Sequence, residues 1–270
     1  MSKDKPLISV IMGIYNCALT LSESIDSLLN QTYKDFELIM CDDGSLDNTY
    51  YIAKQYADKY DNIVLLKNDT NRGLNYTLNH CLKYANGEYI ARQDGDDISL
   101  PERFQKEVDF LDNNPTISLV SCPLIRFDEK GDFCIEKAVA YPDKMDFIHH
   151  SPFRHASCMI RKSVMDSVNG YSESKWLLRV EDYHLWFKIY AKGYRGHNIQ
   201  QPLYKARDDV NAFKRRTLSN RINCVYVRFI GYKMLHIPFY YYIFCFHDII
   251  AYLLPKPIYN ILHKKNTIYK

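Results

Sequence analysis

The sequence lacks several features that mark common classes of protein. Its eight cysteines include no C-x-x-C pair, and several lie inside apolar runs, so we expect them to be reduced in a cytosolic protein. The segment Gly13-Ile-Tyr15-Asn16 stands where a dinucleotide-dependent dehydrogenase would carry Gly-x-Gly-x-x-Gly. No segment resembles a helix-turn-helix, a zinc finger or another module that reads nucleic acid, so no nucleic-acid partner is predicted.

Signals for export and for crossing a membrane are absent too. The first residues lead into a strand-like run without the apolar core of a signal peptide. Near the C-terminus, Pro238 and Pro255 bound an apolar run of 16 residues, which His247 and Asp248 interrupt. A spanning helix needs ~20 apolar residues, so this run is predicted to lie on a membrane surface rather than to cross the membrane.

Charge is divided unevenly along the chain. From Lys205 onward there are 12 Lys and Arg against 3 Asp, a balance of +9, whereas the preceding residues carry −6. A basic, aromatic-rich segment is typical of a region that lies on an anionic membrane. A helical pair packed on the preceding domain and a dimer interface remain alternatives. We therefore predict a first domain over residues 1–205 and a helical C-terminal region over residues 206–270.

The first hundred residues alternate between apolar runs and helical patterns. The predicted strands cover 7–12, 36–41, 63–66 and 89–91, and helical patterns cover 20–29, 52–60 and 74–85. This alternation predicts an α/β fold with a mostly parallel central sheet flanked by helices. Thr20-Leu-Ser-Glu23 and Ser99-Leu-Pro101-Glu102 read as capping boxes, the second with proline at the first helical position. Residues 117–125 read as one further strand.

Carboxylates gather after the fourth predicted strand, where Asp94-Gly-Asp96-Asp97 places three of them within four residues. Ligands bind beyond the carboxyl ends of parallel strands. The sequence also places Tyr15, Asp43 and Arg72 there, each in the loop after a different strand. Oxygen-only ligands at Asp-x-Asp spacing suit Mg2+ or Mn2+. The alternative is an acidic turn that only caps the next helix.

A second acidic pair, Glu181-Asp182, opens an amphipathic helix. The carboxylates there would compensate the helix dipole by ~0.3–1 kcal/mol, which is the alternative to a chemical role. The helix N-terminus is expected to lower the pKa of Asp182. His184, on the same helix, is predicted to be a surface residue.

Taken in order, these motifs resemble those of the family 2 glycosyltransferases with the GT-A fold, most of all the bacterial enzymes that build capsule and O-antigen polysaccharides. The resemblance spans residues 6–205 and rests on Ile8–Asn16, Leu29–Leu38, Asp42-Asp43-Gly44-Ser45, Asn71-Arg72-Gly73, Gly87–Ile90, Asp94–Arg103 and Glu181–Trp186. It implies a Rossmann-like GT-A core. It also implies metal-dependent, inverting transfer of a hexosyl or N-acetylhexosaminyl group from a nucleotide-sugar, expected to be UDP-linked.

The resemblance implies roles for the donor-side residues. Asp43 would accept a hydrogen bond from N3–H of a uracil-type base, and Tyr15 would lie against the ring. Asp94 would lie near the ribose and the metal, and Asp96 would ligate the Mn2+ or Mg2+ that bridges the diphosphate.

Further roles follow from the same resemblance. Arg72 or Arg92 would add positive charge at the diphosphate, and Asp182 would be the general base that takes the proton of the acceptor hydroxyl. His184 stands where many relatives carry another acid. The implied acceptor is a polyprenyl-diphosphate-linked oligosaccharide, which places the enzyme in the cytoplasm, peripheral on the inner face of the cell membrane. A homodimer also remains an expectation.

Two other functions fit parts of the pattern. A haloacid dehalogenase-like phosphatase also uses Asp-x-Asp, but after the first strand of its domain and with Thr or Val soon after. Here the motif follows the fourth predicted strand, and Asp97-Ile98 come next. A non-catalytic, membrane-associated assembly module would depend neither on a metal nor on Asp182.

Overall fold

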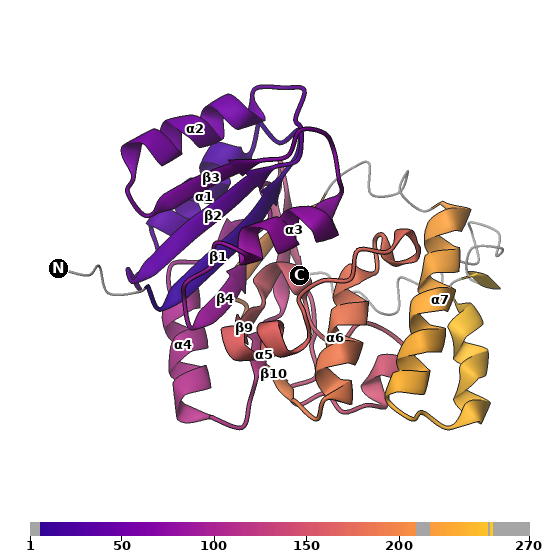
Figure 1. Ribbon diagram of the computed structural model, residues 1–270. Helices are drawn as coiled ribbons and strands as arrows, with labels where there is room; N and C mark the ends of the chain where they lie inside the picture. Colours follow the sequence, from indigo (N-terminus) through magenta and orange to yellow (C-terminus); the bar gives the residue numbers. More distant parts are fainter. Residues whose placement is uncertain (1–5, 209–216, 248, 251–270) are drawn as a thin grey trace.

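The apolar runs of the first hundred residues form the centre of a seven-stranded sheet. The computed structural model describes residues 6–208, 217–247 and 249–250. The sheet strands are β1 (Ile8–Ile14), β2 (Phe36–Asp42), β3 (Ile63–Lys67), β4 (Tyr89–Arg92), β6 (Leu119–Ser121), β9 (Met159–Arg161) and β10 (Gly196–Asn198). Their order is β10-β6-β9-β4-β1-β2-β3 (Figure 1). Only β9 is antiparallel to its neighbours, so the predicted mostly parallel sheet is confirmed.

Helices cover both faces of this sheet. They are α1 (Leu21–Leu29), α2 (Thr49–Lys59), α3 (Leu74–Leu82), α4 (Arg103–Asn113), α5 (Lys162–Ser167) and α6 (Glu181–Ala191). Val10 of β1 packs in a cluster with Ile25 and Phe104, whereas the next residue, Ile11, packs in a second cluster with Leu78 and Trp186. Successive residues of a strand point to opposite faces, so burial on both faces explains why β1 is a nearly continuous apolar run.

The predicted helix starts hold to within a few residues, but both capping boxes are wrong. The helix α1 does begin after Thr20, yet the Thr20 hydroxyl donates to the carbonyl oxygen of Gly95 at 3.0 Å and caps no N–H of the helix. The helix α4 begins at Arg103, after Pro101, and the Ser99 hydroxyl donates to Gln93 Oε1 at 2.7 Å. Both hydroxyls are drawn into contacts around the acidic loop, which local sequence does not reveal.

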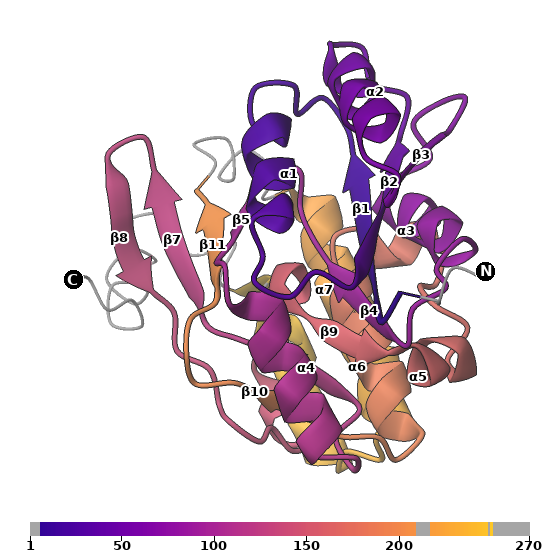
Figure 2. The same ribbon diagram turned by 90° about the vertical axis from the view of Figure 1, so that its left-hand side faces the viewer.

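A second sheet of four strands was not predicted. Its strands are β5 (Ile98–Ser99), β7 (Leu124–Asp128), β8 (Gly131–Ile135) and β11 (Tyr204–Arg207), in the order β5-β11-β7-β8. Figure 2 shows it at one side of the main sheet. The single strand predicted over 117–125 is wrong, because β6 and β7 belong to different sheets. Pro123 lies between them, and a proline has no N–H to continue a ladder.

The predicted helical C-terminal appendage is confirmed for the part that the structure describes. It consists of α7 (Leu218–Met234), which packs beside α6, and the 3-10 helix η5 (Phe239–Phe246), which packs against α7 (Figure 1). The Tyr232 hydroxyl donates to the carbonyl oxygen of Ile148 at 2.7 Å. The other parts of the predicted region, residues 209–216, 248 and 251–270, lie outside the described residues. Among the helices that are described, none combines the length and apolar character needed to span a bilayer.

All eight cysteines are free, as the sequence predicts.

Candidate active site

The loops after β1 and β2 lie side by side at the carboxyl edge of the main sheet. The Asp43 N–H donates to the carbonyl oxygen of Ile14 at 2.9 Å. The Asn16 N–H donates to Ser45 Oγ at 3.1 Å, and Asn16 Oδ1 accepts from Leu46 N–H at 2.9 Å. Tyr15, between these contacts, keeps a side chain that is 44% exposed. The parallel order of the strands thus brings the two candidate donor loops together, as the sequence predicts.

Asp43 is buried and its carboxylate holds the loop before α3. Its Oδ1 accepts from Asn68 Nδ2 and from Arg72 N–H, both at 2.8 Å, and its Oδ2 accepts from Gly73 N–H at 2.9 Å. Gly73 has φ +85°, a conformation that favours glycine. A carboxylate offers about four acceptor positions. Three are used, so Oδ2 retains one for a further donor.

Arg72 contributes its backbone to this arrangement more than its charge. Its guanidinium lies over the ring of Tyr76, at 4.1 Å from the centroid. Of the two arginines that the resemblance suggested for the diphosphate, the one that contacts the acidic loop is Arg92.

The three carboxylates of the acidic loop have three different environments. Arg92, itself buried, donates to both oxygens of Asp94, with Nη1–Oδ2 at 2.7 Å and Nη2–Oδ1 at 2.5 Å. Asp97 is buried and accepts from Arg207 N–H at 2.8 Å. Asp96 is exposed, yet partial desolvation and the charge of Asp94 raise the pKa of its carboxyl. Arg92 thus offsets the charge of Asp94, whereas burial and the charges of Asp94 and Asp96 raise the pKa of Asp97. Among the residues that the structure describes, no ion pair is formed with the Asp96 carboxylate, although the charges of Arg92 and Arg207 act to lower its pKa.

The acidic pair at the start of α6 lies near the same arginine. Burial raises the pKa of Asp182, although the Tyr183 N–H, the Arg92 charge and the Ser151 hydroxyl, 3.4 Å from Oδ2, all act to lower it. The backbone N–H groups at the helix N-terminus do lower this pKa, as expected, but desolvation outweighs them, so the expected net lowering is wrong. Burial and the charge of Asp182 also raise the pKa of Glu181, to about 7.

Arg92 links the two acidic sites. Its guanidinium is hydrogen-bonded to Asp94 and acts through its charge on Asp182. It also adds to the effect of burial in lowering the pKa of His155, whose Nε2 lies 2.7 Å from the Tyr171 hydroxyl. The acidic loop after β4 and the N-terminus of α6 therefore face one buried cation, a proximity that no sequence motif encodes.

His184 is not a surface residue, contrary to the prediction. Its side chain is buried in α6, and burial, together with Lys188 one turn away, lowers its pKa to about 4. It is therefore neutral at physiological pH and does not substitute for the acid that many relatives carry there.

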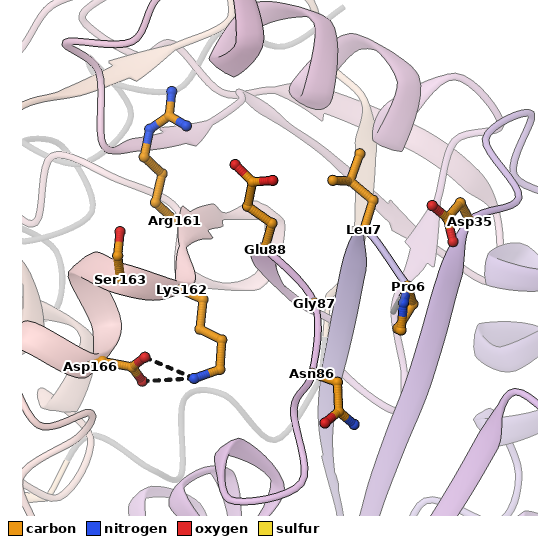
Figure 3. A pocket seen from close by; sticks show the side chains of 10 residues that line it. All are labelled: Pro6, Leu7, Asp35, Asn86, Gly87, Glu88, Arg161, Lys162, Ser163 and Asp166. Carbon is orange, nitrogen blue, oxygen red and sulfur yellow. Dashed lines mark hydrogen bonds and ion pairs between the residues drawn. The ribbon is translucent and has the colours of Figure 1, made fainter. Parts of the chain in front are cut away.

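A separate hollow of about 550 Å3 opens at the opposite edge of the sheet (Figure 3). It is formed where β1 and β4 begin, by residues such as Leu7, Gly87 and Glu88 together with the start of α5. Its Lys162 and Asp166 form an ion pair at 2.8 Å. None of the candidate catalytic or donor residues lines it.

Within the described residues, no three acidic, histidine or cysteine side chains converge in a metal-binding cluster. If a divalent ion binds here, Asp94 and Asp96 would supply at most two of its ligands.

Comparisons with known proteins bear on the family and the fold. The sequence profile described as Glycosyl transferase family 2 matches residues 9–168. The chain is 42% identical to EpsE of Bacillus subtilis (strain 168) over 264 residues, 97% of this chain and 95% of that protein. It is 30% identical, over 233 residues, to the UDP-Glc:alpha-D-GlcNAc-diphosphoundecaprenol beta-1,3-glucosyltransferase WfaP of Escherichia coli, covering 85% of this chain and 89% of that protein.

A solved structure shares the fold. The crystal structure of S. aureus TarS 1-349 in complex with UDP-GlcNAc matches with a TM-score of 0.69 and 18% identity, over 93% of this chain and 76% of that one. The predicted GT-A fold is confirmed, and the phosphatase alternative has no support.

Proposed function

The chain belongs to glycosyl transferase family 2, and we propose that it moves a sugar from a UDP-sugar to a hydroxyl of a lipid-linked saccharide, with inversion at the anomeric carbon. The observation that carries the proposal is that Arg92 donates to both oxygens of Asp94 and also lowers the pKa of Asp182 through its charge. We infer that a reacting sugar would lie with the loop suited to a diphosphate on one side and the candidate base on the other. Inverting sugar transfer needs this division of roles, because the leaving group and the nucleophile lie on opposite faces of the ring.

Asp94 and Asp96 fit a divalent cation that arrives with the donor. Mg2+ is usually bound by one or two carboxylates, with phosphate oxygens and water completing its shell, and Mn2+ prefers the same hard oxygen ligands. The exposed carboxylate of Asp96, beside the negative Asp94, supplies such ligands. When bound, the ion stabilises the negative charge of the departing nucleoside diphosphate as a Lewis acid.

Asp43 and Tyr15 would select the base of the donor. The free acceptor position on Asp43 Oδ2 suits the N3–H of uracil, and the exposed ring of Tyr15 in the adjacent loop offers a stacking surface. Three donors hold the Asp43 carboxylate in place, so it cannot rotate to suit another base. A site built around a hydrogen bond discriminates strongly against partners that leave it unpaired. The UDP-GlcNAc bound by the structural neighbour TarS supports a uridine donor.

Asp182 would act as the general base. Its raised pKa makes the ionised carboxylate a better proton acceptor than an ordinary aspartate, and Arg92 keeps the ionised form accessible. The carboxylate would take the proton of the acceptor hydroxyl as its oxygen bonds to the anomeric carbon and the bond to the diphosphate breaks.

The C-terminal helices would present the enzyme to a membrane-borne acceptor. Leu218, Ile222, Tyr226 and Phe229 follow one another at helical spacing along α7, and each is at least 38% exposed. On η5, Phe239 and Tyr240 are exposed as well. We propose that these side chains, with the basic charge of the region, place the protein on the inner face of the cell membrane. The acceptor named for WfaP, a diphosphoundecaprenol saccharide, is consistent with that position.

The catalytic proposal is tested by UDP release from a panel of UDP-sugars, with Mn2+ and a lipid-linked acceptor. Asp182→Asn should lose ~100 to 10,000-fold in turnover while it still binds UDP with Mn2+, because only the proton acceptor is removed. Asp166→Asn is the control, because it makes the same change from carboxylate to carboxamide at an exposed residue of α5. Near wild-type transfer by Asp182→Asn, or a product that retains the donor's anomeric configuration, would contradict the assigned role.

The membrane proposal needs a surface change that leaves the fold intact. Ile222→Glu with Phe229→Glu should abolish cosedimentation with anionic vesicles, whereas Tyr51→Glu, on exposed α2, should not. If the double variant still sediments with vesicles, the membrane proposal is wrong. If wild type is instead a dimer that the double variant dissociates, this face is a dimer interface.

A further inference from the structure

Gln93 lies buried directly between β4 and the acidic loop, and its side chain makes contacts on both sides. Its Nε2 donates to the carbonyl oxygens of Asp97 at 2.9 Å and Asp94 at 3.2 Å, and to Ser24 Oγ at 2.9 Å. The two carbonyls belong to the first and last residues of the Asp94–Asp97 turn. The side-chain amide of Gln93 therefore links the two ends of the turn by hydrogen bonds to their carbonyl oxygens.

Two hydroxyls of α1 and its cap hold the same turn. Ser24 Oγ donates to the carbonyl oxygen of Asp94 at 2.7 Å, and Thr20 Oγ1 donates to that of Gly95 at 3.0 Å. Gln93, Ser24 and Thr20 thus fix three of the turn's four carbonyls by side-chain bonds. A turn held in this way has little freedom to change the separation of its carboxylates.

The orientation of the Gln93 amide is set by a buried arginine. Gln93 Oε1 accepts from Ser99 Oγ at 2.7 Å and from Arg103 Nη1 at 3.4 Å. A guanidinium has only donors, so the amide oxygen must face Arg103 and the amide NH2 must face the carbonyls of the turn. Arg103 is itself held by Glu107, at 3.2 Å from Nε, and by the carbonyl oxygen of Cys158. The orientation of the donor group therefore rests on a chain of buried contacts below the turn.

We propose that Gln93 is a positioning residue for the carboxylates of Asp94 and Asp96, and that it sets their spacing for a divalent cation and a diphosphate. The inference rests on the proposed role of these two carboxylates. Gln93 itself touches neither the cation nor the donor. It acts on the backbone from which both carboxylates project, and such second-layer contacts commonly change metal affinity by about 10 to 100-fold.

The chain offers a matched control for this residue. Gln31 is equally buried, its Nε2 donates to the carbonyl oxygens of Leu100 at 2.8 Å and Ser27 at 3.2 Å, and its Oε1 accepts from Phe104 N–H. It makes no described contact with Asp94–Asp97. The substitutions Gln93→Glu and Gln31→Glu thus replace a donating NH2 by an oxygen at two equally buried positions, of which only Gln93 holds the turn.

The test measures the affinity of each purified full-length variant for UDP by calorimetry, with Mn2+ and with chelator, alongside its Tm. Gln93→Glu should weaken UDP binding in Mn2+ at least tenfold while leaving binding in chelator within about twofold, as expected when only the cation-dependent part is lost. Gln31→Glu should lower Tm comparably and change neither affinity by more than about twofold. If both variants lose affinity in proportion to Tm, or neither loses any, Gln93 has only a structural role.

A milder variant keeps the test decisive if Gln93→Glu does not fold. Thr20→Val removes the contact to the Gly95 carbonyl and keeps the side chain's shape, and it should weaken the Mn2+-dependent affinity severalfold. Unchanged affinity in Thr20→Val would overturn the proposal that the fixed carbonyls set the site. If wild type shows no Mn2+-dependent binding of UDP, the proposed function fails together with this inference. If the wild type does show Mn2+-dependent binding of UDP and the variants bind UDP as tightly as the wild type, only this inference is overturned.

Discussion

Replacement of Arg92 by methionine removes the guanidinium and keeps much of the side chain's apolar length. The guanidinium is buried and donates to both oxygens of Asp94, at 2.7 and 2.5 Å. Loss of one partner from a fully buried ion pair costs about 3–5 kcal/mol. The Asp94 side chain is 31% exposed, so water replaces part of what is lost. We therefore expect the free energy of unfolding to fall by about 2–4 kcal/mol.

Calorimetry in the presence of a chelator measures this loss. For a chain of this size, 1 kcal/mol corresponds to about 2–4 °C, so Arg92→Met should melt about 4–16 °C below wild type. Lys205→Met is the control, because Lys205 pairs with Asp132 at 2.9 Å and both side chains are partly solvated, 28% and 40% exposed, whereas the Arg92 side chain is 4% exposed. An exposed pair of this kind contributes only about 0–1 kcal/mol.

The same variant has a kinetic consequence. Arg92 lowers the pKa of Asp182 through its charge, so its removal should raise that pKa further. The proposed base works when it is ionised, so the acid limb of kcat/KM should move to higher pH in Arg92→Met. The reasoning is refuted if Arg92→Met and Lys205→Met melt within about 2 °C of each other and the acid limb does not move.

Three further predictions concern other parts of the molecule. Asp43→Ala removes the acceptor for Arg72 N–H and Gly73 N–H as well as the proposed base contact, so calorimetry should show UDP binding at least ~10-fold weaker, and unchanged affinity would contradict the assignment. Asp182→Asn removes a negative charge that helps to raise the pKa of Glu181, so that pKa, about 7 in the wild type, should fall, as an NMR titration of the carboxyl measures; an unchanged value would count against the interaction of the two carboxylates. Gly231→Ala places a Cβ 2.3 Å from the Phe187 ring, so it should destabilise the packing of α7 on α6 by about 1–3 kcal/mol, and an unchanged Tm would mean that the helices separate freely.

Local pattern was enough to predict the central sheet. Strands β1 and β2 are mostly apolar because both faces are covered, and α1 and α4 repeat their apolar residues at helical spacing. Once the strands are parallel, the loop after each one falls at the same edge. This is why Tyr15, Asp43 and Asp94 could be assigned to one site from the sequence.

Other features depend on contacts between distant segments and left no local signal. The strand β9 enters the main sheet antiparallel, and β7 leaves for a second sheet after Pro123. The burial of His184 and the raised pKa of Asp182 both follow from how α6 is packed, whereas the sequence shows only its amphipathic spacing. Gln93 reads as an ordinary polar residue after a strand, and its role is visible only when its bonds to the turn are known.

The contacts of the acidic loop lead us to predict how the binding of Mn2+ depends on the binding of UDP. Both oxygens of Asp94 are engaged by Arg92, and Asp97 is engaged by the backbone of β11. Only Asp96 offers its carboxylate fully, and within the described residues no third acidic, histidine or cysteine side chain completes a cluster. Asp96, together with an Asp94 carboxylate that is already bonded to Arg92, is a poor site for Mn2+, which prefers six oxygen ligands.

Mn2+ alone should therefore bind weakly, with a Kd above ~1 mM, equivalent to less than about 4 kcal/mol. The diphosphate of UDP supplies the missing oxygens, so UDP should tighten Mn2+ binding at least ~10-fold, and by linkage Mn2+ should tighten UDP binding by the same factor. Calorimetric titration of each ligand in the absence and presence of the other measures both factors. Arg92→Met frees the oxygens of Asp94, so in that variant Mn2+ alone should bind more tightly than in wild type. Tight binding of Mn2+ to the wild-type protein without nucleotide would show that the loop is already a complete metal site, contrary to the hydrogen bonds that Arg92 makes with Asp94.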